Sequence, residues 1–205
     1  MSGYDIYDDI AKRTNNNIYI GVIGAVRTGK STFIKRFMDT LVIPNIEDEY
    51  TKERAKDELP QSASGKTIMT TEPKFIPNEP VSISVGDNVN LNVRLIDCVG
   101  YIIPGAEGHM SGDEPRMVNT PWSSVPMPFE KAAETGTEKV IKDHSTIGIV
   151  VTTDGSITDI ERENYVEAEE RVINELKDLG KPFIVLLNSV HPYSPETEEL
   201  RKEIE

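Results

Sequence analysis

The residues with the clearest chemistry are the eight from Gly24 to Ser31, which fit the pattern G-x-x-x-x-G-K-[ST] of a phosphate-binding loop. In such a loop, backbone N–H groups bind the α- and β-phosphates of a nucleotide, and the following helix directs its positive dipole end at them. Lys30 then reaches the β- and γ-phosphates, and the Ser31 hydroxyl joins the shell of a Mg²⁺ ion. A glycine-rich turn with a surface lysine is the alternative, but the apolar run before the motif and the helix-compatible segment after it favour the phosphate loop.

A second element, Asp97-Cys98-Val99-Gly100, follows an apolar run with strand character. We expect the Asp97 carboxylate to hold Mg²⁺, commonly through a water molecule, and the N–H of Gly100 to approach the γ-phosphate, since glycine has no Cβ in the way. By itself the tetrapeptide could be a strand-ending turn. Behind a complete phosphate loop it predicts a Mg²⁺–triphosphate site.

A third element is the polar segment Lys66–Pro73. Nucleotide switches carry here a threonine whose hydroxyl enters the Mg²⁺ shell and whose N–H binds the γ-phosphate, so that hydrolysis releases the segment. Thr70 or Thr71 could take this role, with Thr67 as a weaker third candidate, and an ordinary Ser/Thr loop is the alternative. The predicted catalytic residues are Lys30, Thr70, Thr71 and Asp97, and the predicted Mg²⁺ ligands are Ser31, Thr70 and Asp97.

Two further positions bear on hydrolysis. In small GTPases a glutamine typically follows D-x-x-G and orients the attacking water, whereas this chain has Tyr101 there. A phenol cannot take that role in the same geometry, so another group holds the water or turnover is slow. Arg27, inside the phosphate loop, either adds positive charge at the γ-phosphate or faces solvent.

The nucleobase is predicted from the segment Asn188-Ser189-Val190-His191. Switch GTPases read guanine at this place with N-K-x-D, whose aspartate accepts two hydrogen bonds from the base. Here the asparagine is present and the aspartate is not, so the site loses the discrimination that polar recognition provides. We therefore predict ATP as the nucleotide, while His191 either contacts the base edge or has no ligand role. The residues expected to bind nucleotide are Gly24, Ala25, Val26, Arg27, Thr28, Gly29, Lys30, Ser31, Thr32, Gly100 and Asn188.

A mostly parallel sheet is predicted to position these residues. Short apolar runs at 18–23, 147–151 and 183–187 predict buried parallel strands. The alternating run 89–96 and the run 81–85 before it predict an antiparallel hairpin, because Gly-Asp-Asn between them is turn chemistry. The predicted fold is α/β: a three-layer P-loop NTPase of the GTPase-like (TRAFAC) type, mostly parallel with one antiparallel strand.

Helices are predicted between the strands. The best specified runs from Asp159 to Leu179, opens with a capping box from Thr158 to Glu161 and ends at Gly180. Its apolar side chains recur at helical spacing and predict core packing: Tyr165, Ala168, Val172, Leu176 and Leu179.

Two further helices are expected, over 129–142 and from Ser194 onward. Residues 100–128 are rich in glycine and proline without a sustained period, which predicts a long functional or disordered loop. Residues 1–17 are predicted to be a flexible arm, and 18–205 to be the nucleotide-binding domain.

Composition limits the class of protein. The 205 residues suffice for one α/β domain with a sizeable core, and the net charge of −13 argues against a nucleic-acid-binding surface. The single cysteine, Cys98, suits a reducing compartment, and neither it nor His109 and His144 show metal-ligand spacing. The chain shows no leader pattern and no apolar run near the ~20 residues of a membrane span, so we expect a soluble, cytoplasmic protein.

Four segments carry a family resemblance: GAVRTGKSTFIKRF, MTTEPKFIP, VRLIDCVGY and GHMSGDEPRMVNTPW. Together the chain resembles the stage IV sporulation protein A family of endospore-forming bacteria. The resemblance implies the amino-terminal ATPase portion of a longer protein that polymerises on the forespore surface, in the mother-cell cytoplasm, as the base of the spore coat. It further implies that ATP hydrolysis drives irreversible assembly. A small membrane-bound amphipathic peptide and other coat proteins would bind regions outside this chain.

By the same resemblance, Lys30 and Ser31 match the family's phosphate-loop positions, Thr70 and Thr71 its nucleotide-sensing threonines, and Asp97 its Mg²⁺-holding aspartate. The domain would end before its last strand and helix. Two other functions are open at this point: a regulatory GTPase-like switch that binds effectors reversibly, and a structural module that keeps nucleotide without hydrolysing it.

Overall fold

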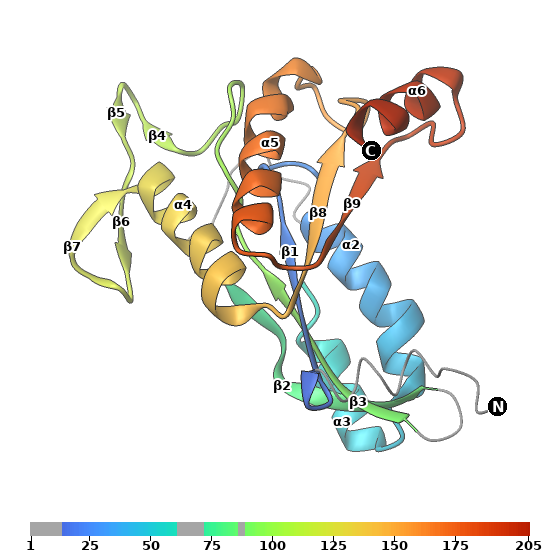
Figure 1. Cartoon of the computed structure of the whole chain (residues 1–205). Helices are drawn as coiled ribbons and strands as arrows, with labels where there is room; N and C mark the ends of the chain where they lie inside the picture. The colour runs from blue at the N-terminus through green and yellow to red at the C-terminus, as the bar shows by residue number, and fades with distance from the viewer. Residues whose placement is uncertain (1–13, 61–71, 86–88) are drawn as a thin grey trace.

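The computed structural model describes residues 14–60, 72–85 and 89–205. Within them lies a five-stranded sheet in the order β2-β3-β1-β8-β9 (Figure 1). β1 (Asn17–Ile23) pairs in parallel with β3 (Val89–Asp97) and β8 (Ile147–Thr153), and β8 pairs in parallel with β9 (Phe183–Asn188). Among the described strands of this sheet, only β2 (Lys74–Val85) pairs antiparallel, with β3. The predicted α/β fold with a mostly parallel sheet is confirmed.

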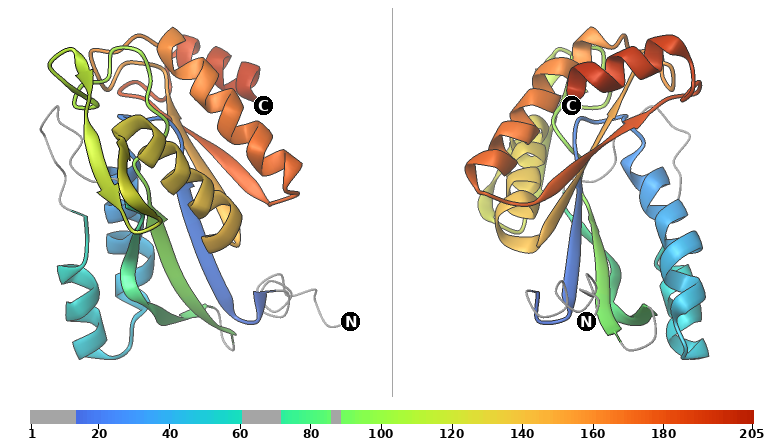
Figure 2. Two further views of the ribbon diagram at one scale, coloured as in Figure 1. Left: turned by 90° about the vertical axis from the view of Figure 1, so that its left-hand side faces the viewer. Right: turned by 45° about the vertical axis from the view of Figure 1, so that its right-hand side comes forward.

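Helices cover both faces of the sheet, as the right-hand view of Figure 2 shows. On one face lie α2 (Lys30–Phe37) and α3 (Glu49–Asp57), and on the other α4 (Phe129–Lys139) and α5 (Glu163–Asp178). β1 serves both layers because its side chains alternate: Ile20 and Val22 join the core under α2, and Ile23 joins the core under α5. This burial on both faces explains why the parallel strands appear in sequence as continuous apolar runs.

Short helical segments extend two of these helices. A π-helical turn, η1 (Met38–Val42), continues α2 and leads into a 3₁₀ turn, η2 (Ile43–Asn45). A second π-helical turn, η3 (Val140–His144), continues α4, so the predicted helix over 129–142 is present with a changed final turn.

The predicted hairpin is present and longer than expected. The pairing of β2 with β3 runs from Lys74 opposite Asp97 to Val85 opposite Val89, with a register shift between Ile76 and Val81. Residues 86–88, which carry the predicted turn chemistry, lie outside the described residues. The part of β2 that was not predicted, residues 74–80, contains two prolines, at 77 and 80, which lie within the register shift. Proline is untypical of a regular strand, so this part of the sequence shows no strand pattern.

The start of α5 differs from the sequence prediction. The helix begins at Glu163, and its N-cap position has no side-chain hydrogen bond, so the predicted capping box at Thr158 is wrong. The Thr158 hydroxyl instead accepts from the N–H of Ile160 at 3.2 Å and lies 2.9 Å from the Tyr165 hydroxyl. The Thr158 hydroxyl is therefore engaged in a local turn and in a contact with Tyr165, and it does not cap the helix.

The end of α5 follows the prediction. Gly180 has φ 62°, its N–H donates to the Lys177 carbonyl, and the N–H of Lys181 donates to the Leu176 carbonyl, both at 3.0 Å. These two bonds are the Schellman arrangement that glycine permits. The predicted core stripe is buried as far as Leu176, but Leu179 is 45% exposed because it sits at the C-cap, beyond the last turn that packs on the sheet.

The last helix, α6 (Pro195–Ile204), begins where predicted. Ser194 is its N-cap, and the Ser194 hydroxyl accepts from the N–H of Thr197 at 3.2 Å. Among the described residues, no helix is long and apolar enough to cross a membrane.

Residues 100–128 contain secondary structure that sequence patterns did not predict. β4 (Met110–Ser111) pairs with β5 (Glu114–Pro115), and β6 (Met117–Thr120) pairs with β7 (Ser123–Pro128), beside α4 at the left of Figure 1. The expectation of a loop throughout was wrong. Strands this short, with mostly exposed side chains, show no hydrophobic alternation from which to predict them.

Candidate functional site

The turn between β1 and α2 contains the predicted phosphate loop. Gly24, Arg27 and Gly29 have φ angles of 138°, 65° and 91°. A Cβ at Gly24 would lie 2.3 Å from the Val151 carbonyl oxygen, and one at Gly29 would lie 2.5 Å from the amide nitrogen of Asn188. Both the backbone angles and the close neighbours therefore require glycine at these two positions.

Lys30 is the first residue of α2 and is only 5% exposed. Its ammonium donates to the Ala25 carbonyl at 2.5 Å. Burial lowers the pKa of Lys30, although the neighbouring Cys98 and Asp97 act in the opposite direction. A buried cation at a helix N-terminus is electrostatically suited to an anion, and a phosphate group would replace the solvation that the ammonium has lost.

Ser31 and Asp97 meet beside Lys30, although 66 residues separate them in the chain. The Ser31 hydroxyl donates to Oδ2 of Asp97 at 2.6 Å. The other oxygen, Oδ1, is buried and has no hydrogen-bond partner among the described residues, and burial raises the pKa of this carboxyl. A hydroxyl, a carboxylate and an orphaned carboxylate oxygen are the hard oxygen donors that Mg²⁺ prefers, so these residues fit the ion predicted here.

Gly100 packs directly on the phosphate loop. Its φ is 92°, and a Cβ there would lie 2.1 Å from the Gly24 carbonyl oxygen and 2.7 Å from the Lys30 ammonium. The N–H of the next residue, Tyr101, donates to the Gly24 carbonyl at 3.2 Å, and the N–H of Val26 donates to the Tyr101 carbonyl at 2.9 Å. The two motifs that the sequence places 66 residues apart therefore form one backbone-linked unit.

Asn188, at the end of β9, holds this unit from the side. Its amide donates to the Thr28 carbonyl at 3.0 Å, and the Thr28 hydroxyl donates to the Ala25 carbonyl at 3.1 Å. The structure thus brings Asn188 to the phosphate loop. Thr70 and Thr71, and the weaker candidate Thr67, lie outside the described residues.

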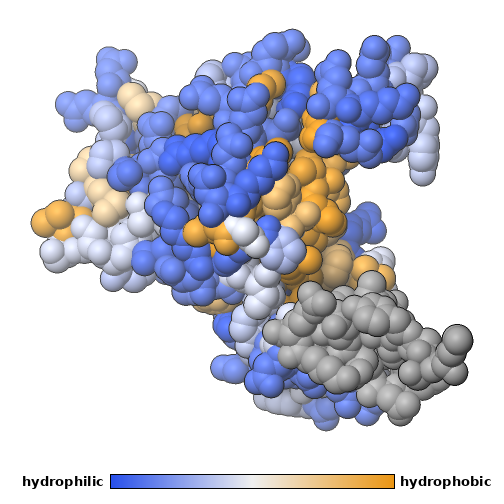
Figure 3. All heavy atoms as spheres, in the orientation of Figure 1, coloured by the Kyte–Doolittle hydropathy of each residue, from blue (hydrophilic) through white to orange (hydrophobic). Residues whose placement is uncertain are grey.

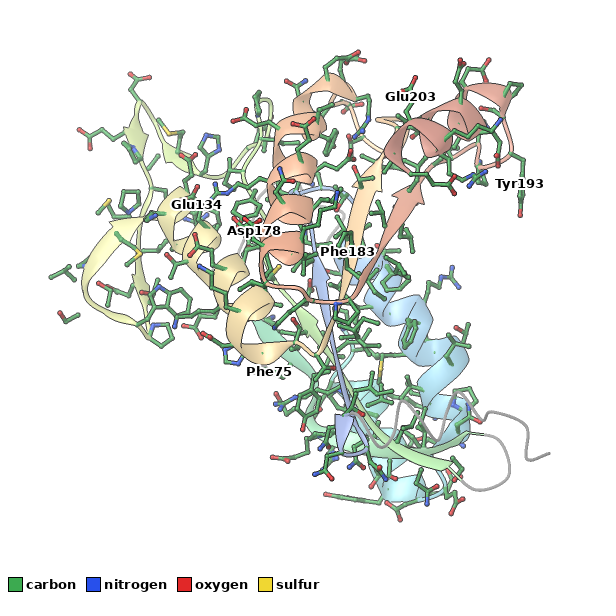
Figure 4. The ribbon with its side chains drawn as sticks, viewed as in Figure 1. Phe75, Glu134, Asp178, Phe183, Tyr193 and Glu203 are labelled. Carbon is green, nitrogen blue, oxygen red and sulfur yellow. The ribbon has the colours of Figure 1, made fainter. Side chains whose placement is uncertain are left out.

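The segment after Asn188 is organised by Asp154, which follows β8. One oxygen of the Asp154 carboxylate accepts from the Ser189 hydroxyl at 2.5 Å, and the other accepts from the N–H and hydroxyl of Ser156. These hydrogen bonds lower the pKa of Asp154 against the opposing effect of desolvation. His191 is exposed, and Tyr193, which is 92% exposed, projects away from α6 (Figure 4).

A separate cavity of about 460 Å³ lies between α4, α5 and the segment 101–105. Its lining does not include the phosphate loop. It includes carboxylates from both helices, at Glu130, Glu134 and Glu167, together with Arg171.

A family model described as "Stage IV sporulation protein A, ATPase domain" matches residues 1–205. The chain belongs to this family. The resemblance inferred from the sequence motifs is thereby confirmed, and the domain type is that of an ATPase from a sporulation protein family.

Two relatives called stage IV sporulation protein A, from Bacillus anthracis and Bacillus subtilis (strain 168), are each 62% identical over 204 residues, covering 100% of this chain and 42% of the relative. A third, from Clostridioides difficile (strain 630), is 64% identical over 201 residues, covering 98% of this chain and 41% of the relative. The chain therefore spans less than half the length of these relatives. Two solved structures of SsGBP mutation variants are also similar. The first variant matches 95% of this chain and 48% of its own chain, with 17% identity and a TM-score of 0.41. The second variant matches 95% of this chain and 47% of its own chain, with 18% identity and a TM-score of 0.40.

Two residues near this ATPase-family site were not singled out for the roles that the structure gives them. Asp154 had no predicted role, although its position directly after a buried strand is a signal for a site residue at the carboxyl edge of a parallel sheet. The sequence marks Tyr101 only as a replacement for glutamine, whereas in the structure Tyr101 is 2% exposed and packs in the core under α5.

Proposed function

We propose that this chain binds Mg²⁺-ATP in the turn between β1 and α2 and hydrolyses it to ADP and phosphate. The observation that carries the proposal is the buried Lys30 ammonium beside the Ser31–Asp97 pair, under a turn whose glycines allow close approach. The family description as an ATPase domain supports it.

Each residue has a defined part in this proposal. Backbone N–H groups of the phosphate loop bind the phosphates, and Lys30 stabilises negative charge that develops between the β- and γ-phosphates. Ser31 and Asp97 would hold Mg²⁺, which would supply Lewis-acid stabilisation of phosphate oxygens. We assign to Thr70 and Thr71 the sensing of the γ-phosphate, and Arg27 is a candidate for additional positive charge there.

The proposed base is adenine. The segment after Asn188 presents Ser189, Val190 and His191 where a guanine-reading site needs a carboxylate acceptor. Asp154, whose carboxylate contacts this segment, already accepts hydrogen bonds from Ser189 and Ser156. Without a free acceptor, the site offers no partner to the N1–H and the 2-amino group of guanine, so it does not select guanine over adenine.

On the scale of the whole protein, we propose an ATPase that self-assembles on the forespore surface, in the mother-cell cytoplasm, as the base of the spore coat. Hydrolysis would drive this polymerisation. A small membrane-bound amphipathic peptide would recruit the protein, and other coat proteins would bind it, through regions outside these 205 residues. Nucleic acid is not a proposed partner, because the net charge of −13 opposes phosphate binding over an extended surface.

Phosphate release tests the proposed activity. The protein should release phosphate from ATP with Mg²⁺, and should lose the activity when EDTA removes the metal. Faster release from GTP would instead support a regulatory GTPase-like switch, and no release from either nucleotide would support a structural module that holds nucleotide. Binding of both nucleotides, measured by calorimetry, distinguishes that module from a protein with no nucleotide site.

The threonine assignment has its own test. The double substitution Thr70→Ala with Thr71→Ala should leave ATP binding intact and reduce hydrolysis, because the hydroxyls act on the γ-phosphate and Mg²⁺ rather than on the base. Thr40→Ala is the control, because Thr40 is exposed on η1 and its hydroxyl donates only locally, to the Arg36 carbonyl. Wild-type turnover in the double variant would remove both threonines from the mechanism.

A further inference from the structure

Tyr101 directly follows Gly100, but its side chain points into the helical layer. The Tyr101 hydroxyl donates to the carboxylate of Glu175 on α5, with oxygen–oxygen distances of 2.7 and 2.8 Å. Burial, and then the hydrogen bond to Glu175, raises the pKa of Tyr101, so the phenol remains protonated and remains a donor. This side chain is therefore engaged in the protein interior and is not available to orient water as a glutamine would.

A second contact holds the ring of Tyr101. The Arg171 guanidinium lies 4.0 Å from the ring centroid, in a cation–π arrangement. The same guanidinium donates to Glu175 at 3.1 Å and to Glu134 of α4 at 2.6 Å. Tyr101 therefore contacts α5 directly, through its hydrogen bond to Glu175, and is linked to α4 through Arg171 and Glu134. These hydrogen bonds involve charged groups, which makes them stronger than neutral ones. We call Glu134, Arg171 and Glu175 the tyrosine clamp.

The backbone of Tyr101 is joined to the phosphate loop on the other side, through its hydrogen bonds to Gly24 and Val26. Gly100 lies between this junction and the Mg²⁺-binding Asp97, and there is no space for even a Cβ between Gly100 and Lys30. A displacement of Tyr101 therefore also displaces the Gly100 N–H relative to the Lys30 ammonium.

We propose that Tyr101 is a positioning residue for ATP hydrolysis: the tyrosine clamp fixes its side chain, and its backbone thereby fixes Gly100 beside the γ-phosphate position. The inference rests on the proposed function of the site. Catalytic contacts lose effect when they are misplaced by about 1 Å, whereas the phosphate-loop N–H groups and Lys30 would still bind nucleotide after Gly100 loosens. Tyr101 acts through the backbone, which distinguishes it from a water-orienting glutamine.

Tyr101→Phe tests the proposal because it removes the hydroxyl and keeps the ring under Arg171. We expect kcat for ATP to fall about tenfold, because a misplaced Gly100 N–H stabilises the developing charge less well, with KM within twofold of wild type. Tyr19→Phe is the matched control, because Tyr19 packs against the same core from the start of β1. Its kcat should equal that of wild type.

Amide hydrogen exchange supplies a readout that does not depend on turnover. In Tyr101→Phe, exchange of the amides at positions 26 and 101 should accelerate several-fold, while the same two amides in Tyr19→Phe should exchange as in wild type. Unchanged exchange and unchanged kcat in Tyr101→Phe would overturn the proposal, as would an equal loss in both variants. If the wild-type protein hydrolyses no ATP, the proposed function and the catalytic role fail together, and exchange still decides whether the clamp holds the phosphate loop.

Discussion

The phosphate end and the base end of the proposed nucleotide site differ in what holds them. At the phosphate end, Thr28 and Lys30 are buried, and Gly100 packs on the loop without space for a Cβ. At the base end, Val190 is 56% exposed and Tyr193 is 92% exposed. Tight backbone packing leaves little room for sequence change, whereas exposed side chains can change without disturbing the core. This contrast explains how a guanine-reading aspartate can be absent while the phosphate loop is complete.

The hydropathy of the surface changes between the C-terminal helices and the edge of the sheet. Figure 3 shows hydrophilic side chains over α5 and α6 and apolar side chains reaching the surface between them and α2. β9, whose Ile184 is 57% exposed, contributes to this region. The exposed side chains of Val190 and Tyr193 make the base end the more open of the two ends.

Lys30→Ala should have the largest effect. We expect phosphate release from ATP to fall about 1,000-fold, because a preorganised cation at the developing charge is lost. Lys35→Ala is the control, since Lys35 lies on the exposed side of the same helix. Circular dichroism verifies that both variants fold. Retained turnover in Lys30→Ala would place the phosphates elsewhere in the molecule.

The reactivity of the buried Cys98 thiol measures how tightly the phosphate end is packed, and this measurement needs no substitution. Burial raises the pKa of Cys98 to about 11. The thiolate is the reactive species, so at pH 8 alkylation by iodoacetamide should be about 100-fold slower than in the guanidinium-unfolded chain, whose thiol titrates near 9. The native rate should rise with pH up to about 11. Equal rates in the two states would mean that the segment 97–100 opens readily.

Asn188→Ala tests the contact that joins the base end to the phosphate end. Removing its amide leaves the Thr28 carbonyl unpaired, at a cost of roughly 1–3 kcal/mol, and we expect KM for ATP to rise about tenfold. Asn164→Ala is the control, because the Asn164 side-chain amide donates to the Glu161 carbonyl just before α5, at 3.5 Å, away from the phosphate loop. An unchanged KM would show that the loop keeps its shape without Asn188.

His191→Ala should have the smallest effect. The side chain is exposed, and the local hydrogen bond uses its backbone N–H, which donates to the Ser189 hydroxyl at 2.9 Å and survives the substitution. We expect KM for ATP to change less than about twofold, as is usual for exposed positions. A rise above about fivefold, seen with ATP but not with GTP, would make His191 a base contact.

Patterns within a few residues of each other predict several elements of this structure. The octapeptide 24–31, the hairpin order of β2 and β3, the Ser194 cap and the glycine stop at 180 all follow from patterns within a few residues. Burial on both faces also made the parallel strands visible as apolar runs. These signals, with the segments that carry the family resemblance, were sufficient for the fold class and the family.

Contacts between residues far apart in the chain, by contrast, become visible only once the chain is folded. The phenol of Tyr101 finds Glu175 across 74 positions of the chain, and Asn188 finds the Thr28 carbonyl across 160. Tertiary contacts also moved the start of α5 from Asp159 to Glu163, because the Thr158 hydroxyl is occupied by Ile160 and Tyr165. Periodicity and motifs report the backbone preference of short segments. Which distant side chains become hydrogen-bond partners depends instead on the order of the strands and on how the two helical layers pack against the sheet, and these are not specified by local preference.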